Sequence, residues 1–237
     1  MGRKFEVRKA AMAKTGLQKS KLYSRFGKEI YITARNGGTN PEANLSLKHL
    51  IERAKKQQVP SDIIKRNIEK AEGAGGEDYQ AIRYEGFGPT GSSFIVDTLT
   101  DNVNRTVSEV RHCFTKMGSK LGVKGSVEHM YEHLSYITVK GTSADDLLEL
   151  LLEEEIEVTD IEELEEGVEI TADGYELDKI ETVLRNNETL EIVESESGWY
   201  PLDYVTLEGE EKEKVDKFMD MINDLEDVQN VYHNVEE

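Results

Sequence analysis

A row of basic side chains near the N-terminus is the feature of this sequence best suited to chemistry. Lys21, Arg25, Lys28 and Arg35 lie at offsets of 0, 4, 7 and 14 residues. At ~100° per residue in an α-helix, these offsets fall within an arc of about 80°. The apolar side chains centred on the opposite face are Leu22, Phe26, Ile30 and Ala34. We therefore predict a solvent-facing cationic row whose chemistry is contact with phosphate groups.

Further basic residues extend this predicted nucleic-acid-binding surface. An N-terminal arm or loosely docked helix contributes Arg3, Lys4, Arg8 and Lys9. The segments that follow the row add Lys48, Arg53, Lys55, Lys56, Lys65, Arg66 and Lys70. Phosphate contacts position a protein on a backbone without reading its sequence, so the pattern does not choose between DNA and RNA. The alternative interpretation is that these cations only solvate the outside of a helical bundle.

Two loop motifs could also bind a ligand. The glycine-rich run Tyr84–Gly91 lacks the Gly-Lys-Ser/Thr ending of a P-loop, and Pro89 removes one backbone donor. We predict a tight structural turn there, leading into a strand over 93–99. The run from Thr100 to Thr106 is typical of a helix cap, from which Arg105 and Arg111 could reach a ligand or a neighbouring domain as secondary contacts.

The sequence offers little for metal binding or catalysis. His129 and His133 lie in a strand-like region, where four residues span ~13 Å, too far for one zinc ion. Cys113, next to His112, has no motif around it that marks a nucleophile, and the acids lie in runs rather than as an acid–base pair in a cleft. We predict no catalytic residues, no metal and no cofactor, and hence not an enzyme.

Composition and charge narrow the class of protein further. The chain has 237 residues, of which 37% are hydrophobic and 32% charged, which suits two or three small domains. The single cysteine cannot form an internal disulfide, and neither a secretory signal nor a membrane-spanning run is present. These features predict a cytoplasmic protein with no membrane partner.

The net charge of −19 conceals a strong asymmetry along the chain. Residues 1–72 hold 17 Lys+Arg against 7 Asp+Glu, whereas residues 73–237 hold 12 against 41. A polyanion responds to the local potential within ~8–10 Å, so the basic N-terminal part remains a candidate for nucleic acid. The run 145–169 holds 13 acids and no Lys or Arg. It is either a solvated face or a docking surface for a basic protein partner.

The hydrophobic pattern predicts an α+β protein of three domains. Helical spacing over 20–36, over 41–58 and from Pro60 to Ala71 predicts a basic helical domain, 1–76, with Pro60 in a first helical turn and a glycine-rich linker at its end. A strand at 93–99, a helix over 105–117 and a strand opening at Gly125 begin an α+β domain. Strands and helices from 134 to 194 follow the order βαββαβ, typical of ferredoxin-like domains. The tail, a helix over 209–226 and a strand near 229–233, has no sheet of its own. We therefore predict an α+β domain of 77–132 plus 203–237, with an acidic ferredoxin-like domain, 133–202, inserted in it.

Several runs also carry a family resemblance over the whole chain. They are Y-E-G-F-G-P-T-G at 84–91, L-T-D-N-V-N-R-T-V-S-E-V-R at 99–111, the G-S-V at 125–127 and D-V-Q-N-V-Y-H-N at 227–234. Together they resemble the YebC family of transcriptional regulators. The start M-G-R-K and the helix K-L-Y-S-R-F-G-K-E-I-Y look most like its YeeN branch.

The resemblance implies a helical domain, an α+β domain and an inserted ferredoxin-like domain, with neither catalysis nor cofactor. Some members are regarded as DNA-binding transcriptional regulators and others, including mitochondrial relatives, as translational activators acting on the ribosome. This chain departs from the family pattern at Lys4–Arg8, where most members have Lys-Trp-x-Asn-Ile. It departs again at Gly118–Gly122, where they have Gly-Gly-Asn-Leu/Met-Gly.

The leading hypothesis is a transcriptional regulatory protein that binds DNA through its basic helical domain. The first alternative is a translation factor that docks on ribosomal RNA, and the second is a non-catalytic adaptor that binds a protein through its acidic domain. The −29 charge of residues 73–237 would be repelled by long naked DNA, which favours contact through one end of the molecule.

Overall fold

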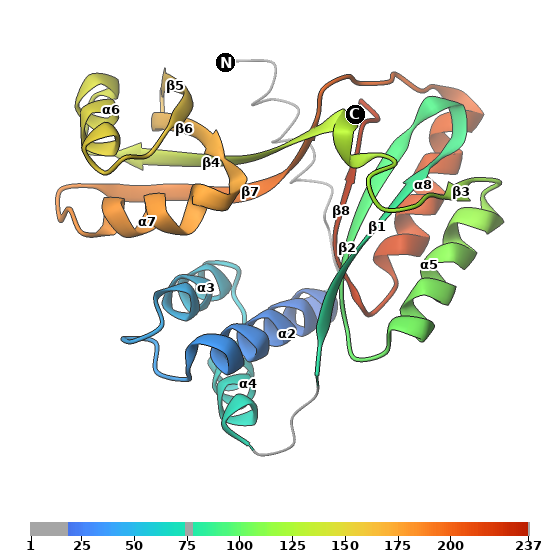
Figure 1. The fold of residues 1–237 in the computed structure, drawn as a ribbon, viewed down its shortest axis with the longest axis horizontal. Helices are drawn as coiled ribbons and strands as arrows, with labels where there is room; N and C mark the ends of the chain where they lie inside the picture. Colours follow the sequence, from blue (N-terminus) through green and yellow to red (C-terminus); the bar gives the residue numbers. More distant parts are fainter. Residues whose placement is uncertain (1–18, 74–77, 237) are drawn as a thin grey trace. The chain divides into compact units, whose positions relative to one another are not determined.

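Three amphipathic helices open the part of the chain that the structure describes, residues 19–73 and 78–236 of a computed structural model (Figure 1). They are α2 (Lys19–Gly37), α3 (Leu45–Lys56) and α4 (Ser61–Glu72). The apolar row of α2 is buried, as its spacing predicts, against Leu47 and Leu50 of α3 and Ile64 of α4. These helices therefore share one hydrophobic core.

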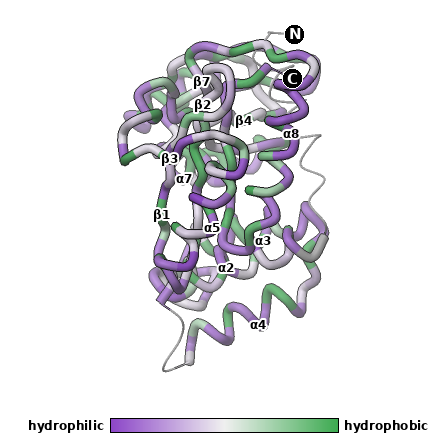
Figure 2. Tube along the Cα trace, turned by 90° about the vertical axis from the view of Figure 1, so that its right-hand side faces the viewer, coloured by the Kyte–Doolittle hydropathy of each residue, from purple (hydrophilic) through white to green (hydrophobic). Residues whose placement is uncertain are grey.

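The ends of two helices differ from the sequence prediction. The structure begins α3 at Leu45 rather than near residue 41, because the Asn44 side chain accepts a hydrogen bond from the backbone N–H of Leu47 and caps the helix. Pro60 precedes α4 as its N-cap residue instead of lying in the first turn. Along α4 the hydropathy alternates between hydrophilic and hydrophobic, as Figure 2 shows, which is the pattern of a helix with one buried face.

An antiparallel sheet follows, with two helices against one face (Figure 1). Its order is β3-β1-β2-β8. The strands are β1 (Gln80–Phe87), β2 (Ser93–Thr100), β3 (Lys120–Leu121) and β8 (Val228–His233), and the helices are α5 (Val103–Lys116) and α8 (Gly209–Asn223). Phe94 of β2, Phe114 of α5 and Phe218 of α8 form the centre of this core, with ring centroids 4.6–6.2 Å apart.

The C-terminal segment returns to this first sheet, as the sequence predicts. β8 pairs antiparallel with β2, joining Val96 to Val231 and Phe94 to His233 across about 140 intervening residues. An isolated bridge between Val205 and Val235 adds a further contact. The polypeptide on both sides of residues 129–203 thus builds one sheet.

Two predictions for the loops of this region were wrong. Tyr84–Phe87 belongs to β1, and only Gly88–Ser92 forms the turn, which includes the short 3-10 helix Pro89–Gly91. Gly125–Val127 does not open a strand. This segment precedes the 3-10 helix Glu128–Met130, and the backbone N–H groups of Gly125 and Val127 donate to the buried Glu85 carboxylate.

Residues His129–Asp203 form a compact unit with its own sheet. Its strands are β4 (Tyr131–Lys140), β5 (Val158–Leu164), β6 (Gly167–Asp173) and β7 (Glu191–Pro201), and its helices are α6 (Ala144–Glu153), the 3-10 helix Gly174–Glu176 and α7 (Leu177–Arg185). Along the chain these elements follow the expected order βαββαβ. In the sheet the strands lie in the order β5-β6-β4-β7, and all neighbouring strands are antiparallel. Ile137, Leu147, Ile170 and Ile180 are fully buried between the sheet and its helices.

The chain is therefore a mixed α/β protein with two antiparallel sheets. It divides into two compact units, one of residues 129–203 and the other containing the helices α2–α4 together with the first sheet. The predicted division into three domains, with a separate domain 1–76, remains a prediction. Among the described residues, no helix is both long and apolar enough to cross a membrane.

Candidate nucleic-acid interface

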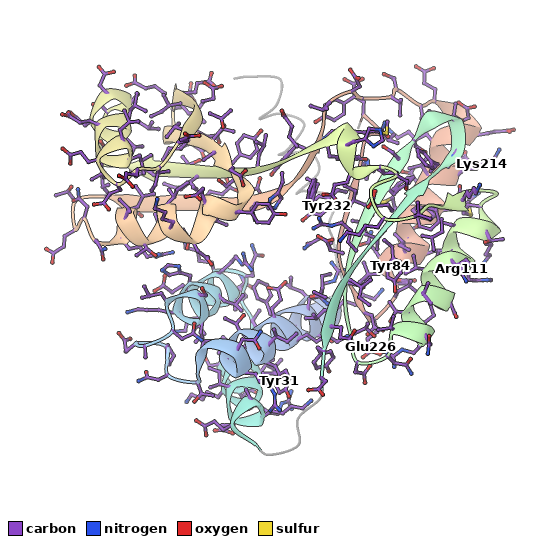
Figure 3. All side chains as sticks on the ribbon, viewed as in Figure 1. Tyr31, Tyr84, Arg111, Lys214, Glu226 and Tyr232 are labelled. Carbon is purple, nitrogen blue, oxygen red and sulfur yellow. The ribbon has the colours of Figure 1, made fainter. Side chains whose placement is uncertain are left out.

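The central cation of the predicted row is buried in an ion pair. Lys28 Nζ lies 2.9 Å from Asp227 Oδ1 and donates to the Glu226 carbonyl at 3.0 Å, and the two charged side chains are only 11% and 2% exposed. Glu226 is marked in Figure 3. Lys28 also lies over the Tyr79 ring, 5.6 Å from its centroid. This ammonium group is fully engaged within the protein.

Its neighbours in the row face the same segment of chain. Lys21 forms an ion pair with Asp224, and Arg25 Nη2 lies 3.4 Å from the side-chain oxygen of Asn223. Burial lowers the pKa of Arg25, and the charge of Glu29 opposes that effect. The partners lie at and just after the C-terminal end of α8, so the polar face of α2 is turned toward the first sheet and its helices.

These contacts correct the orientation predicted from helical spacing. Lys21, Arg25 and Lys28 do share one face, but they hold α2 to residues 223–227 instead of facing solvent. Arg35 lies about two turns after Lys28 and is the exposed member of the row. It forms one long hydrogen bond, of 3.4 Å, to the Gly73 carbonyl. The other four predicted contacts, Arg3, Lys4, Arg8 and Lys9, lie outside the described residues.

A second cation meets the same carboxylate. Arg105, predicted as a secondary contact, lies 2.7 Å from Asp227 Oδ2 and 2.9 Å from Asp101 Oδ1. The hydroxyls of Thr100 and Thr106 donate to Asp227 Oδ2 at 3.0 and 2.7 Å. Burial disfavours the Asp227 carboxylate, but these hydrogen bonds and the Lys28 charge outweigh it and lower its pKa to about 2. The pKa of Arg105 is raised, chiefly by its hydrogen bond to Asp227.

Asp227 is the residue of this junction that the sequence analysis missed. It lies 199 positions from Lys28 and 122 from Arg105, so no local spacing links it to either. The available signal was an acid placed directly before a buried strand, within the run 227–234. The Thr100–Thr106 motif does cap α5, through Asn102, whose side chain accepts from the Arg105 N–H. It also supplies the hydroxyls and guanidinium that hold Asp227.

Apart from Arg35 on α2, the exposed cations described in the helical region lie on α3 and α4. Lys55, Lys65 and Arg66 are exposed, and none of their side chains forms a hydrogen bond or ion pair with another described residue. Other cations here have partners: Lys48 pairs with Glu42, and Arg53 with Glu29, at 3.0 and 3.1 Å. Lys55, Lys65 and Arg66 are therefore positioned to meet an external anion.

The glycine-rich run around residue 86 serves packing. A Cβ added at Gly86 would lie 2.3 Å from the Phe114 ring, and one at Gly88 would lie 2.3 Å from the Phe94 ring. Both glycines let rings of the core reach the backbone. The turn that the sequence predicts for 84–91 is confined to Gly88–Ser92, where the Gly88 N–H donates to the Ser92 carbonyl at 2.8 Å.

A buried carboxylate organises the neighbouring loop. Glu85, on β1, is 2% exposed and accepts hydrogen bonds from the backbone N–H groups of Gly125, Val127 and Glu128 at 2.6–2.8 Å. Burial acts to raise the pKa of Glu85, but the three backbone donors outweigh it, so its pKa is lowered. The carboxylate thereby fixes the loop that joins β3 to the 129–203 unit.

The histidines and the cysteine show no arrangement for chemistry. His133 stacks on Trp199, with centroids 4.9 Å apart, and contacts Tyr175, so its ring is part of an aromatic cluster. Cys113 is 3% exposed, and burial raises the pKa of its thiol, which disfavours a nucleophilic thiolate. Among the residues described, no group of three or more His, Cys, Asp or Glu could hold a metal ion.

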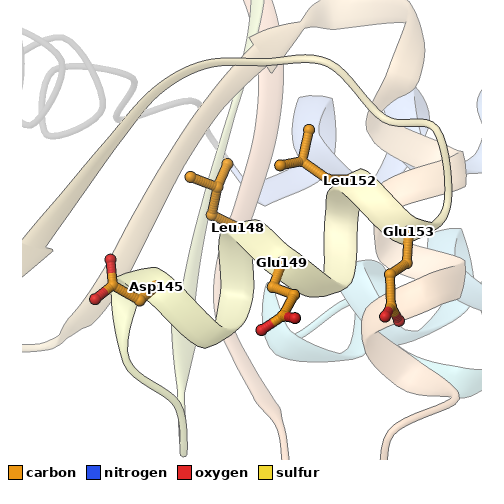
Figure 4. Close-up of a pocket in the computed structure, with 5 residues that line it drawn as sticks. All are labelled: Asp145, Leu148, Glu149, Leu152 and Glu153. Atoms are coloured by element: carbon orange, nitrogen blue, oxygen red, sulfur yellow. The ribbon is translucent and has the colours of Figure 1, made fainter.

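The negative charge is concentrated in the 129–203 unit. It holds 23 Asp+Glu against 3 Lys+Arg, whereas the rest of the chain holds 25 against 26. A hollow along α6 is lined by Asp145, Leu148, Glu149, Leu152 and Glu153 (Figure 4). All five side chains come from one helix, with no facing base or nucleophile among the lining residues. A basic protein partner for this acidic surface remains a prediction.

Comparison with known proteins links the whole chain to one group of sequences. Residues 3–74 match a family model described as the TACO1/YebC protein N-terminal domain, and residues 79–235 match one described as the TACO1/YebC second and third domain.

Relatives of the same length carry a regulatory name. Proteins named "Probable transcriptional regulatory protein" are 52% identical to this chain in Pseudoalteromonas atlantica, over 99% of this chain and 97% of the relative, and 52% identical in Vibrio campbellii, over 100% of both. A crystal structure of a conserved hypothetical protein, Aq1575 from Aquifex aeolicus, has a TM-score of 0.72 and 37% identity. That match covers 94% of this chain and 93% of the other.

Proposed function

Because the chain belongs to the TACO1/YebC family, we propose that it is a transcriptional regulatory protein that binds duplex DNA through exposed cations of its N-terminal helical domain. We assign residues 1–76 to that domain. The α+β domain and the inserted unit are separate from it. The names of the relatives support a regulatory role and describe no enzyme. The finer assignment, to DNA and to particular side chains, rests on charge and exposure.

The observation that carries the proposal is a set of three cations on α3 and α4 whose side chains have no partner among the described residues. Lys55, Lys65 and Arg66 are exposed in a segment, 1–72, that has a net charge of +10. Lys21 and Lys28, in contrast, are already neutralised by Asp224 and Asp227. Each phosphate that a free cation neutralises releases condensed counterions, which gives affinity without any base reading. Arg35 is a fourth contact of the same kind.

The test is binding to a short duplex DNA across a salt series, measured by fluorescence anisotropy. The charge-reversal variant is Lys55→Glu/Lys65→Glu/Arg66→Glu. Three lost phosphate contacts should reduce the log–log salt slope by about 2.7, and affinity at low salt should fall with it. The matched control, Lys212→Glu/Lys214→Glu/Lys217→Glu on α8, changes the net charge equally and reports the effect of charge alone. Equal losses in both variants would remove the basis for a contact on α3 and α4.

A second variant separates binding from domain docking. Lys28→Gln leaves the cations of α3 and α4 in place but removes the buried charge opposite Asp227. We expect a lower unfolding midpoint with little change in the salt slope. A salt slope that falls as steeply as in the α3–α4 variant would instead place Lys28 in contact with DNA and contradict the assignment.

Ribosomal RNA is the competing target, because phosphate contacts carry no base sequence and the same cations fit an RNA backbone. A sucrose gradient of cell lysate distinguishes the two. Co-migration with ribosomes that the Lys55→Glu/Lys65→Glu/Arg66→Glu variant loses would favour a translation factor. Absence from ribosomal fractions together with salt-dependent DNA binding supports the regulator.

A further inference from the structure

A second cationic surface lies on the α5 side of the first sheet. It consists of four exposed basic side chains and one exposed histidine, which we call the α5 cationic face: Arg111, His112, Lys116, Lys120 and Lys124. Figure 3 shows Arg111 on the outer side of α5. Arg111 is predicted from the sequence as a secondary contact, and the structure adds the exposed side chains around it.

The helical phase of α5 explains why these side chains face solvent together. Val110, Cys113 and Phe114 are buried against the sheet and α8. At ~100° per residue, Arg111, His112 and Lys116 project from the opposite half of the helix, within an arc of about 140°. They span about 7.5 Å along the axis of α5, which is far enough for Arg111 and Lys116 to contact different phosphate groups.

The rest of the face is held by the sheet and by Glu85. Lys120 lies on β3, which pairs with β1 through Phe87, so it sits on the edge strand beside α5. Lys124 lies in the loop whose backbone donates to the Glu85 carboxylate at Gly125 and Val127. The backbone of this loop is therefore held by hydrogen bonds to a buried carboxylate, which reduces the backbone entropy lost when a ligand binds.

The charge of the face contrasts with its surroundings. Residues 102–127 hold five Lys+Arg and a single acid, Glu109, whereas residues 78–101 and 204–237 hold 4 Lys+Arg against 15 Asp+Glu. Within the part of the chain that the structure covers, the side chains of Arg111, Lys116, Lys120 and Lys124 form no ion pair or hydrogen bond. An edge-strand lysine alone would only discourage strand pairing, but four unpaired cations on three adjoining elements leave a net positive surface.

We propose that the α5 cationic face is a second contact for the phosphate backbone of duplex DNA, in addition to the cations of α3 and α4. This proposal rests on the proposed function, because it assigns a further contact to the same partner. Charge complementarity favours this occupant, since a phosphate strand presents regularly spaced anions to a row of fixed cations. Two separated contacts would orient the protein on the duplex, which one cluster of cations cannot do.

The experiment compares two charge-reversal variants of the full chain. Arg111→Glu/Lys116→Glu alters the face, and Lys214→Glu/Lys217→Glu is the matched control on exposed positions of α8. Both change the net charge by the same amount on a helix of the same domain. Binding to a short duplex DNA is measured across the salt series, and circular dichroism melting checks that both variants remain folded. The salt slope should fall by about 1.8 in the face variant beyond any change in the control.

The possible results separate this inference from the proposed function. If the face variant binds like the control while the α3–α4 variant loses binding, the inference is overturned and the proposed function stands. If the parent chain shows no salt-dependent DNA binding, both are overturned. The acidic 129–203 unit of a second copy is the rival occupant. A parent dimer in size-exclusion chromatography that Arg111→Glu/Lys116→Glu converts to monomer would assign the face to self-association instead. A shallower salt slope of the Arg111→Glu/Lys116→Glu variant, together with an unchanged oligomeric state, supports the DNA contact.

Discussion

At the scale of single residues, Asp227 determines how the helical region joins the first sheet. Its carboxylate is 2% exposed and satisfies Lys28, Arg105 and two threonine hydroxyls at once. A buried ion pair of this kind adds modest net stability, but removal of one partner leaves an uncompensated buried charge. Loss of Asp227 should therefore cost far more than loss of a surface acid nearby.

We expect Asp227→Asn to lower the free energy of unfolding by roughly 3–5 kcal/mol, because it strands the Lys28 ammonium. The control is Asp224→Asn, which removes the exposed partner of Lys21, a pair in which Asp224 is 72% exposed. That change should cost no more than about 1 kcal/mol. Urea unfolding followed by circular dichroism measures both. Similar costs for the two variants would show that the junction does not depend on the buried carboxylate.

The same carboxylate predicts a pH dependence. Its pKa falls from 3.8 to about 2 on folding, so the folded state favours the ionised form. Its contribution to stability is complete above about pH 4 and is lost as the pH falls toward 2. Asp227→Asn should abolish the part of the acid-induced loss that lies in this range. An unchanged slope of unfolding free energy against pH between 4 and 2 would contradict the assignment.

A further prediction concerns Glu85, whose carboxylate binds the loop that forms part of the α5 cationic face. In Glu85→Gln the amide can accept from fewer of the three backbone donors, so we expect a loss of roughly 1–3 kcal/mol. The lowered pKa of Glu85 also places its contribution above its ordinary value of 4.5, to be lost at lower pH. Glu128→Gln, whose side chain is 37% exposed, is the control. Equal unfolding midpoints for the two variants would show that the Glu85 carboxylate does not stabilise the loop through its three backbone donors.

At the scale of elements, much of the architecture follows from local patterns. The apolar spacing of α2, α3 and α4 predicts each helix, and the run at 93–99 predicts β2, because each pattern buries one face or a whole strand. β1 was missed since Gly86 and Gly88 made its end resemble a turn, and the two-residue β3 carries no pattern at all. These glycines are needed because the rings of Phe114 and Phe94 pack directly against the backbone at Gly86 and Gly88.

The candidate site was harder to predict for a physical reason. Helical phase shows that Lys21, Arg25 and Lys28 share a face, but it does not reveal what covers that face. Their partners at 223–227 lie about 200 residues away, and their pairing depends on how the chain returns to β2. On α3 and α4, in contrast, the side chains of Lys55, Lys65 and Arg66 are exposed and form no ion pair with a described residue. Spacing alone cannot distinguish the two cases.

The turn between α2 and α3 depends on one side chain. Asn44 accepts from the Leu47 N–H, and its amide donates to the carbonyls of Thr33 and Gly38 at 3.0 and 2.8 Å. Asn44→Ala should destabilise the chain by about 1–2 kcal/mol or more, since it removes the cap and both donors. Asn44→Ser keeps a capping oxygen and loses both amide donors, so thermal melting should rank the parent above Ser and Ser above Ala. A Ser variant as unstable as the Ala variant would assign no role to the cap.

At the scale of the whole molecule, the charge is divided by compact unit rather than by halves of the chain. The 129–203 unit carries a net charge of −20, and all other residues together carry 26 Lys+Arg against 25 Asp+Glu. Residues 73–128 and 204–237, which build the first sheet, hold 18 Asp+Glu against 9 Lys+Arg, so they carry a smaller acidic excess, which the basic residues 1–72 offset. Long-range repulsion of a polyanion therefore comes mainly from the 129–203 unit, whose potential is screened by salt more readily than a direct contact is.

Neutralising part of that unit should therefore strengthen DNA binding only at low salt. We expect Glu149→Gln/Glu153→Gln/Glu162→Gln/Glu166→Gln, all at exposed positions, to raise the affinity for a short duplex roughly twofold to fivefold at low salt through weaker repulsion. At ~1 M salt the Debye length falls to ~3 Å, and the difference should disappear in any residual binding. Anisotropy titrations at several salt concentrations measure this. Equal affinity at low salt would show that the acidic unit does not act on DNA through its field. A gain that persists at high salt would instead indicate a direct contact at the substituted positions.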